Sequence, residues 1–497
     1  MKIFSDIVLD KKSQQHLYMQ LFNKIRQMII DGKIKANYKL PAIRPLASKL
    51  GVNTSTIVNT YALLEKEGFV YKKIGSGTFV SAILTHKNED DILQKYPLDE
   101  DIKLMDRGQM QIKKNMISFA SATPTSDLFP VEDFKILLNE VLDRDKGAAF
   151  GYQESQGYYP LRDALVNYLK TYEIETNPEN IQIISGAQQG IDVIAKAFID
   201  HGDTVIVESP TYTGAIGTFR SRGAKIITIP ILTDGIDVDR LEECIKNYKP
   251  KLVYIMPNFQ NPTGYSYSLE KKMKVMSLAE KYNTLIVEDD YLSDLSFCSS
   301  DNTALKSLDS SNSIIYIKSF SKIFMPGLRL GFLIIPPKIH QKILEAKHTS
   351  DISTSGLNQR VFDLYLRNGM WKKHIKYMED IYRERFEVMK SCLEKYFSTL
   401  QLNYSIPQGG LHFWFELPDG YDATKLYSQA AKNNILILPG NIFFPLAKGN
   451  RFFRLSIAAV KSKDIEIGIK KLAEVIEKMI GKDSKKEQKA DAYTPLL

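Results

Sequence analysis

Residues 314–331 read IIYIKSFSKIFMPGLRLG, and this stretch says more than any other about the architecture and chemistry of the chain. It opens with an apolar run of strand length, Ile314–Ile317. Where that run ends, the sequence supplies small hydroxyls, a lysine and an arginine: Ser319, Ser321, Lys322 and Arg329. A lysine amine can form a Schiff base with an aldehyde, while hydroxyls and a guanidinium can hold a phosphate. The spacing therefore predicts a site for a phosphorylated aldehyde, although an ordinary loop lysine would also fit it.

Similar apolar runs recur on both sides of this stretch and define the fold class. They cover Ile181–Ser185, Thr204–Glu208, Lys225–Ile229, Leu252–Met256, Leu285–Glu288 and Leu330–Ile335. Amphipathic stretches separate most of them, and the runs are apolar on both faces. This pattern predicts an α/β body with a largely parallel sheet covered by helices. Further runs near Leu411–Glu416, Ile435–Leu438 and Phe452–Ile457 follow long helical stretches and predict a smaller α+β lobe.

Carboxylates directly follow the run that ends at Glu288. A carboxylate in the sequence EDDY, which contains Asp289 and Asp290, could pair with a protonated pyridine nitrogen. This pairing would raise the pKa of the pyridine and keep the ring an electron sink. A second interpretation stays open, since two aspartates at a strand end could bind Mg²⁺. No phosphate-binding loop or other metal motif accompanies them, so we expect no metal site.

Three more motifs lie where predicted strands end. The segment SGAQQG at 185–190 passes into a helix, whose first backbone amides could bind phosphate. The segment ESPTY at 208–212 places Tyr212 where it could stack on a flat ring. The segment NFQNPTG at 258–264 presents an asparagine amide that could donate to a ring oxygen. Each has an ordinary alternative: a glycine loop, core packing of Tyr212, and a common turn.

Arg454 lies on the otherwise apolar run Phe452–Ile457. A buried arginine is costly without a partner, and bidentate capture of a carboxylate would supply one. An internal salt bridge is the alternative. Five of these six motifs lie at the carboxyl ends of predicted strands, where open α/β sheets bind their ligands.

The excess positive charge sits at the start of the chain. Residues 1–80 contain 13 Lys and Arg against 5 Asp and Glu, whereas the other 417 residues contain 53 of each. This asymmetry predicts a nucleic-acid-binding module joined to a neutral body, with a solvated basic arm as the alternative.

The same region has the pattern of a winged helix-turn-helix. Apolar residues at helical spacing run from Leu17 to Ile29, a short helical segment covers 43–50, and Gly51 supplies a turn. A second helix begins near Asn53, and two short β runs enclose the glycine-rich turn 75–77. We expect residues 10–80 to form this domain and residues 81–115 to be a charged linker. A docked segment anchored by Ile92, Leu93 and Met105 is the alternative for the linker.

Composition sets the remaining limits. The chain has 497 residues, 44% of them hydrophobic and 25% charged, which excludes a mostly disordered protein. Three scattered cysteines without a CxxC pair speak against a disulfide scaffold or a cysteine zinc site. The absence of an apolar leader and of a run of about 18 apolar residues predicts a soluble cytosolic protein. Residues 481–497 are expected to form a frayed polar tail.

Taken together, these motifs resemble two known families. Residues 116–480, with SGAQQG, SPTY, NPTG, EDDY, SFSK, GLRLG and RLSI, resemble a fold-type I, pyridoxal-phosphate-dependent aminotransferase. Residues 10–80 resemble a winged helix of the GntR type, and their fusion resembles the MocR-type transcriptional regulators. The resemblance implies a regulator that binds DNA and senses an amino acid, an amine or pyridoxal phosphate. An active aminotransferase with an appended DNA-binding domain is the alternative.

The resemblance also implies residue roles. Lys322 would form the Schiff base, Asp289 would pair with the pyridine nitrogen, and Asn261 and Tyr291 would bond the ring oxygen. The stacking aromatic would be Tyr212, and Arg454 would receive an α-carboxylate. The phosphate would be held by Ala187, Gln188, Ser319, Ser321 and Arg329, together with Tyr152 from a neighbouring subunit. The residues facing DNA would be Arg44, Asn53, Thr54, Thr56, Lys73, Gly75 and Gly77.

Two departures from the GntR pattern concern the DNA-binding segment. Ala42 stands where the family often has serine, and Thr54 stands where it often has arginine, which removes a guanine-binding side chain. The operator sequence therefore cannot be inferred by analogy. The resemblance further implies a homodimer, head-to-tail and domain-swapped, whose two DNA modules read two half-sites.

Overall fold

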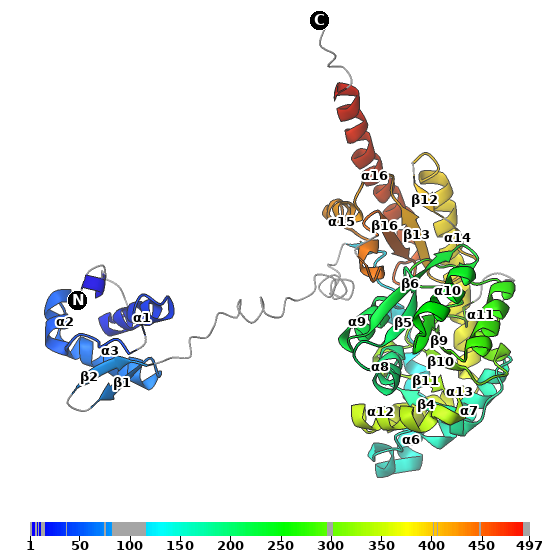
Figure 1. The fold of residues 1–497 in the computed structure, drawn as a ribbon, viewed down its shortest axis with the longest axis horizontal. Helices are drawn as coiled ribbons and strands as arrows, with labels where there is room; N and C mark the ends of the chain where they lie inside the picture. Colours follow the sequence, from blue (N-terminus) through cyan, green and yellow to red (C-terminus); the bar gives the residue numbers. More distant parts are fainter. Residues whose placement is uncertain are drawn as a thin grey trace, which may run out of the picture. The chain divides into compact units, whose positions relative to one another are not determined.

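The structure is a computed structural model of the chain. It describes residues 2–4, 7, 9–10, 15–35, 37–73, 76–81, 116–295, 302–400, 402–404, 406–446 and 449–490, the last ten of these by their backbone only. The chain forms two compact units, Met1–Lys103 and Leu104–Leu497 (Figure 1). Apart from Ser81, the segment expected to be a linker lies outside the described residues.

The first unit is a winged helix-turn-helix. Helices α1 (Leu17–Ile30), α2 (Ile43–Leu50) and α3 (Thr54–Lys66) precede the antiparallel hairpin β1 (Val70–Lys73) and β2 (Gly77–Val80). Gly51 ends α2 with a φ of 62°, a backbone conformation that glycine adopts without strain. Leu21, Ile25, Leu46, Ile57 and Leu64 form the centre of one small hydrophobic core. The predicted architecture of this unit is confirmed.

The second unit is built on an eight-stranded sheet with the order β4-β11-β10-β9-β8-β5-β6-β7. The strands are β4 (Ile181–Ile184), β5 (Thr204–Ser209), β6 (Lys225–Leu232), β7 (Gly235–Ile236), β8 (Leu252–Ile255), β9 (Leu285–Asp290), β10 (Ile314–Ser319) and β11 (Gly331–Ile334). Neighbours from β10 to β6 are parallel, whereas β11 is antiparallel to both of its neighbours and β7 is antiparallel to β6. The largely parallel sheet expected from the apolar runs is therefore present.

Helices bury this sheet on both faces (Figure 1). On β5, Val205 and Val207 belong to one hydrophobic cluster and Ile206 belongs to the other, because successive side chains point to opposite faces. The helices of this part are α6 (Val131–Asp145), α7 (Tyr159–Lys170), α8 (Ala187–Phe198), α9 (Thr213–Ser221), α10 (Val238–Tyr248), α11 (Leu269–Tyr282), α12 (His340–Asp351) and α13 (Gly356–Arg367).

A smaller lobe follows. Its sheet has the order β12-β13-β16-β15, and a separate parallel pair joins β14 to β3. Its elements are β3 (Ile117–Ser118), β12 (Asn403–Tyr404), β13 (His412–Glu416), β14 (Ile435–Leu436), β15 (Leu438–Pro439), β16 (Phe452–Ser456), α14 (Met370–Tyr396), α15 (Ala423–Lys432) and α16 (Ser462–Ala490).

Two details of this lobe differ from the expectation. The predicted strand over 435–438 is two short strands in different sheets, because the chain leaves β3 and joins β16 at this point. The backbone of α16 is helical to Ala490, so the first part of the expected polar tail continues this helix. Across the described residues, the structure has no helix with the length and apolar character needed to span a membrane.

Candidate cofactor site

The site lies where β8, β9 and β10 end beside the smaller lobe. These neighbouring strands are parallel, so their carboxyl ends meet at one edge of the sheet. The register pairs Asp289 of β9 with Ile317 of β10, and the loop carrying Lys322 begins directly after β10. The motifs that are dispersed along the sequence thus come together at one edge.

Asp289 is buried, and its two carboxylate oxygens differ. Tyr254 of β8 donates its hydroxyl to Oδ2 at 2.6 Å. Oδ1 is equally buried and has no hydrogen-bond partner among the described residues. Burial raises the pKa of Asp289 to about 6, while the bond from Tyr254 opposes this shift. The carboxyl group of Asp289 is therefore ionised at neutral pH, and its Oδ1 is free to accept a hydrogen bond from a ligand.

Asp290 points into a different network, so the two carboxylates do not converge as a Mg²⁺ site would require. Its Oδ2 accepts from Lys318 at 3.1 Å, and Lys318 also lies 2.7 Å from Asp294. The hydroxyl of Tyr168 donates to the other oxygen of Asp294 at 2.6 Å. Among the described residues, no three or more His, Cys, Asp or Glu side chains gather closely enough to hold a metal ion.

Lys322 has no hydrogen bond or ion pair to any described residue, unlike the buried Lys318 four positions earlier. Burial lowers the pKa of its amine to about 8, and the positive charges of Arg454 and Arg329 act in the same direction. Asp289 opposes them. A lysine with a depressed pKa and a free amine is suited to nucleophilic attack on an aldehyde.

Arg329 and the start of α8 lie against each other. Arg329 adopts a positive φ of 54° and donates Nη2 to the carbonyl oxygen of Ser185 at 2.7 Å. A Cβ on Gly186 would lie 2.6 Å from that Nη2, so a glycine is needed here. The first amides of α8, from Ala187, have no partner within the helix, and together with the guanidinium they form an anion-binding corner. At the end of β10, the hydroxyl of Ser319 accepts a hydrogen bond from the backbone amide of Ser321 at 3.3 Å.

The side chain of Gln188 is occupied in a way that the sequence did not indicate. Its amide nitrogen donates to Thr218 at 2.9 Å, and its oxygen accepts from the hydroxyl of Tyr212 at 3.2 Å. Gln188 therefore positions Tyr212, and only its backbone amide remains available to a phosphate. Gly214 makes room for the Tyr212 ring, since a Cβ there would lie 2.5 Å from it.

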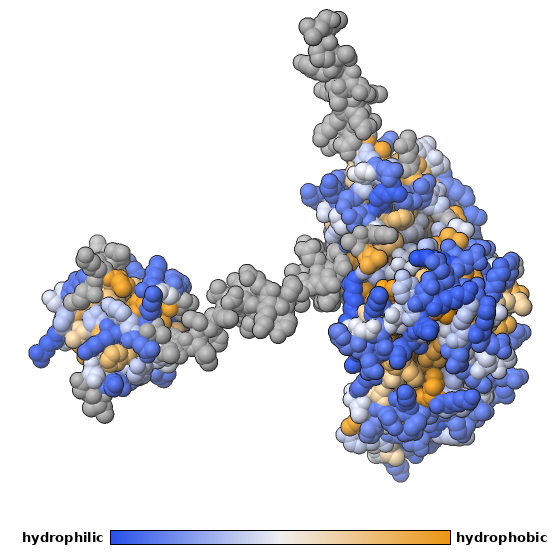
Figure 2. All heavy atoms as spheres, in the orientation of Figure 1, coloured by the Kyte–Doolittle hydropathy of each residue, from blue (hydrophilic) through white to orange (hydrophobic). Residues whose placement is uncertain are grey.

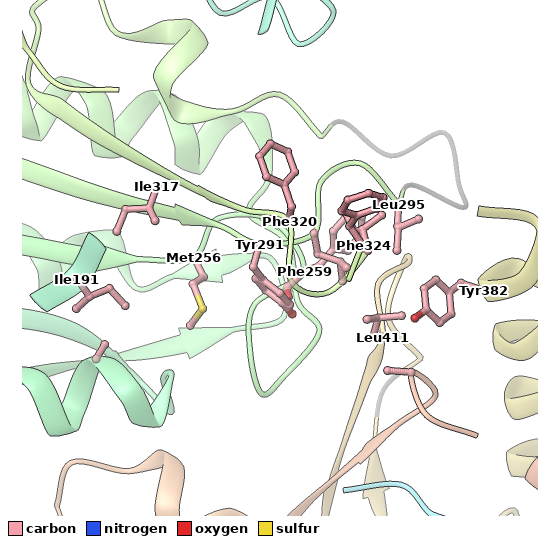
Figure 3. Close-up of a cluster of buried hydrophobic side chains, with 14 of the residues drawn as sticks. Ile191, Met256, Phe259, Tyr291, Leu295, Ile317, Phe320, Phe324, Tyr382 and Leu411 are labelled. Carbon is pink, nitrogen blue, oxygen red and sulfur yellow. The ribbon is translucent and has the colours of Figure 1, made fainter. Parts of the chain in front are cut away.

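Tyr291 directly follows β9, and Asn261 lies in the segment after β8. The hydroxyl of Tyr291 donates to the carbonyl oxygen of Phe259 at 2.5 Å, and Figure 3 labels both residues near the ends of the strands. Asn261 accepts from Arg454 through Oδ1 at 2.9 Å, which leaves its amide nitrogen available to a ligand.

Arg454 is a buried cation without a carboxylate partner among the described residues. It donates to Asn261 and, at 2.6 Å, to the carbonyl oxygen of Ala120, and it lies 5.3 Å from the centre of the Phe443 ring. Its Nε has no partner in the described chain. Burial lowers its pKa to about 10. The internal salt bridge considered as the alternative is not formed with any described residue.

Tyr152 does not join these residues within one chain. It is 88% exposed, next to Phe150 at 70%. In the first unit, Arg44, Asn53, Thr54, Lys73 and Gly77 are exposed and Thr56 is half-buried, whereas Gly75 lies outside the described residues. Asn53 caps α3 without using its side chain, so its amide group is open to solvent.

Sequence reasoning missed Tyr254, Lys318 and His412. Tyr254 and Lys318 lie within apolar strands, and only the register places their polar ends against Asp289 and Asp290. His412 follows the pair Gly409-Gly410 in PQGGLHFWF, and a polar residue within that apolar run was the available signal.

Comparison with known proteins agrees with this geometry. Residues 114–472 match the family model "Aminotransferase class I and II", and residues 17–80 match "Bacterial regulatory proteins, gntR family". The chain is 28% identical over 447 residues to the HTH-type transcriptional regulator NorG of Staphylococcus aureus, covering 89% of this chain and all of that protein.

Two solved structures are similar to the body. The kynurenine aminotransferase of Pyrococcus horikoshii, in complex with PMP, superposes with a TM-score of 0.73 at 32% identity, over 78% of this chain and 96% of that chain. The α-aminoadipate aminotransferase LysN of Thermus thermophilus, complexed with N-(5'-phosphopyridoxyl)-L-leucine, gives 0.70 at 32% identity, over 77% and 100%.

Fold and site thus define a fold-type I aminotransferase body that takes pyridoxal phosphate, preceded by a GntR-type DNA-binding domain. The chain belongs to the aminotransferase class I and II family, and its two-part architecture is that of the MocR-type regulators.

Proposed function

We propose that this protein is a transcriptional regulator that binds DNA through its winged helix and senses an amino acid, an amine or pyridoxal phosphate in its body. In this proposal residues 10–80 are the DNA-binding module, residues 81–115 the linker and residues 116–480 the sensing body. One observation carries it: a GntR-type domain shares its chain with a site whose buried polar groups lack partners. A DNA-binding role also implies a location in the cytoplasm.

The residues present fit pyridoxal phosphate. Oδ1 of Asp289, buried and without a partner in the described chain, would accept from the ring nitrogen. Lys322 would attach to the aldehyde, Tyr212 would stack on the ring, and the start of α8 with Arg329 would hold the phosphate. When bound, the cofactor supplies an aldehyde that captures amines and a ring that accepts electron density.

The same site fits a ligand with a carboxylate. Arg454 is buried, charged and held in place by Asn261 and Ala120, and no described carboxylate neutralises it. A buried charge without a partner is strongly unfavourable. A ligand carboxylate would therefore stabilise the protein with Arg454 buried and charged. A ligand can change DNA affinity only if it binds two conformations of the protein unequally.

We further propose a homodimer, with Tyr152 completing the site of the partner subunit. Large apolar side chains are exposed on α6 and on the segment after it: Val131, Ile136, Phe150, Tyr152 and Tyr159. Figure 2 shows hydrophobic side chains gathered near α8 and α12 on a body surface that is otherwise mostly hydrophilic. Apolar surface of this kind supports an interface between subunits.

A working aminotransferase is the second candidate. The polar groups that would hold pyridoxal phosphate and a carboxylate are all present, and both structural relatives named above are aminotransferases. Continuous release of a 2-oxo acid at about 1 s⁻¹ or faster would favour this candidate over a sensor.

The experiment that tests the proposal measures DNA binding by the full chain. Duplexes are selected from a random pool, and their affinity is measured by fluorescence anisotropy with and without pyridoxal phosphate. We expect pyridoxal phosphate to change the affinity of the wild type and not that of Lys322→Ala. Absence of DNA binding at low salt, or an equal response in Lys322→Ala, would contradict the proposal.

A further inference from the structure

His412 is a buried side chain whose polar atoms have no partner in the described chain. It begins β13, its side chain is 0% exposed, and both ring nitrogens lack a hydrogen bond to any described residue. Buried polar atoms are almost always paired, and leaving them unpaired is unfavourable. A phenylalanine would fill this place without that disadvantage. A bound ligand would supply the hydrogen-bond partner that the described residues do not give this imidazole.

The position of His412 shows where that partner would lie. Its ring stacks on Tyr291, with the ring centres 6.1 Å apart and the planes at 18°. The register of β13 and β16 pairs His412 with Ser456 and Trp414 with Arg454. His412 and Arg454 are therefore diagonal neighbours on one face of the small sheet, a separation that long side chains bridge.

The charges around His412 define its chemical state. Burial and the positive charges of Arg454 and Lys322 hold its pKa well below the ordinary value. The ring is therefore neutral at physiological pH, with one N–H donor and one acceptor nitrogen. The residues of the phosphate corner come from β10, α8 and the Arg329 loop, not from this small sheet. His412 thus belongs to the end of the site that receives the ligand.

We propose that His412 is a second carboxylate-binding residue, which donates its N–H to the carboxylate that Arg454 holds. A carboxylate can accept from several donors at once, so the imidazole and the guanidinium can share it. His412 would then favour ligands with a carboxylate over simple amines. This inference rests on the proposed function, because it assigns the ligand class of the same site.

Two probes test this without knowledge of the natural ligand. Aminooxyacetate and methoxyamine both condense with an aldehyde through the same aminooxy nitrogen, but only aminooxyacetate has a carboxylate. Full-length protein loaded with pyridoxal phosphate is mixed with each probe, and the rate of the absorbance change is measured. The ratio of the two rates reports recognition of the carboxylate, with methoxyamine as the internal reference.

The variants are His412→Phe, which keeps the aromatic contact with Tyr291, His412→Gln, which keeps an N–H donor, and Arg454→Gln as the reference for the carboxylate site. We expect His412→Phe to lower the ratio by about 10-fold or more, the size of a hydrogen bond to a charged group, and His412→Gln to recover part of it. The Tm of His412→Phe should equal or exceed that of the wild type, because two unpaired polar atoms are removed.

Each contrary outcome has one meaning. An unchanged ratio in both His412 variants, with a lower ratio in Arg454→Gln, would overturn this inference and leave the proposed function intact. An unchanged ratio in all three variants would overturn the inference and also the carboxylate-binding part of the proposed function. A lower Tm in His412→Phe together with an unchanged ratio would identify a purely structural histidine.

Discussion

The two oxygens of the Asp289 carboxylate have different surroundings, and this difference determines how the group titrates. Tyr254 donates to one oxygen and stabilises the ionised form, while burial of both raises the pKa to about 6. Above that pH the group is a carboxylate that can pair with a cationic ring nitrogen. Below it the group is neutral and the pairing is lost.

This predicts how binding of pyridoxamine phosphate, which has no aldehyde, depends on pH. Its affinity should fall as the pH is lowered through about 6. Tyr254→Phe should move this midpoint upward, because it removes a hydrogen bond that lowers the pKa of Asp289. Isothermal titration calorimetry across the pH range measures the midpoint in the wild type and in Tyr254→Phe. Asp289→Asn is the control, because position 289 then has no carboxyl group that titrates. A midpoint that stays in place in Tyr254→Phe would contradict the assignment.

Lys322 gives a second prediction at this scale. Its pKa of about 8 means that the neutral, reactive amine predominates only above that pH. Covalent attachment of pyridoxal phosphate should therefore speed up by about tenfold per pH unit below 8 and level off above it. Stopped-flow absorbance measures the rate. A plateau that begins only near pH 10 would show that the amine is not desolvated.

The residues of the site differ in how well the sequence predicts them. Lys322, Asp289 and Arg454 stand out because a charged group next to or within an apolar run needs a reason. Tyr254 does not stand out, because aromatic residues are ordinary in such runs. His412 is visible as a polar residue in an apolar run, but only strand register reveals what it and Tyr254 face. The free amine of Lys322 and the occupied side chain of Gln188 also depend on packing that the sequence alone does not contain.

At the scale of elements, helix α9 contains a matched pair of glycines. A Cβ on Gly214 would lie 2.5 Å from the ring of Tyr212 and closer still to the side chain of Gln188, whereas Gly217 has open space around it. Gly214→Ala should therefore displace Tyr212 and weaken binding of pyridoxal phosphate by about 2- to 10-fold, the value of one aromatic stacking contact. Gly217→Ala should leave it unchanged. Equal affinities in the two variants, measured by absorbance titration, would show that Tyr212 does not stack on the ring.

The wing offers a second matched pair. Lys72 and Lys73 are adjacent on β1, but Lys72 forms an ion pair with Glu65 at 2.5 Å, whereas Lys73 is exposed with no ion pair to a described residue. If Lys73 contacts a DNA phosphate, Lys73→Ala should reduce the slope of log affinity against log salt by about 1. Lys72→Ala should reduce it by less. Fluorescence anisotropy at several salt concentrations measures both slopes. Slopes equal to that of the wild type in both variants would place the wing away from the DNA.

The elements themselves were largely predictable. The runs over 181–185, 204–208 and 252–256 form strands. They could be predicted because they are apolar on both faces, as expected for strands of a sheet that helices cover on both sides. The division of 435–438 into two strands was not predictable, because it depends on which distant strands lie beside it.

For the whole molecule, the uneven distribution of charge predicted the division into a DNA-binding module and a body. The comparisons confirm that division in the family models that match each part. The connection between ligand and DNA is the part that sequence alone does not supply, because it requires two conformations with different ligand affinities.

The most direct test of the account is to locate the lysine that captures pyridoxal phosphate. The full chain is incubated with pyridoxal phosphate, reduced with borohydride, digested, and mapped by mass spectrometry. We predict a single phosphopyridoxyl modification, on Lys322, and none on Lys318, whose amine is held by Asp290 and Asp294. Modification of another lysine, or of none, would contradict the account.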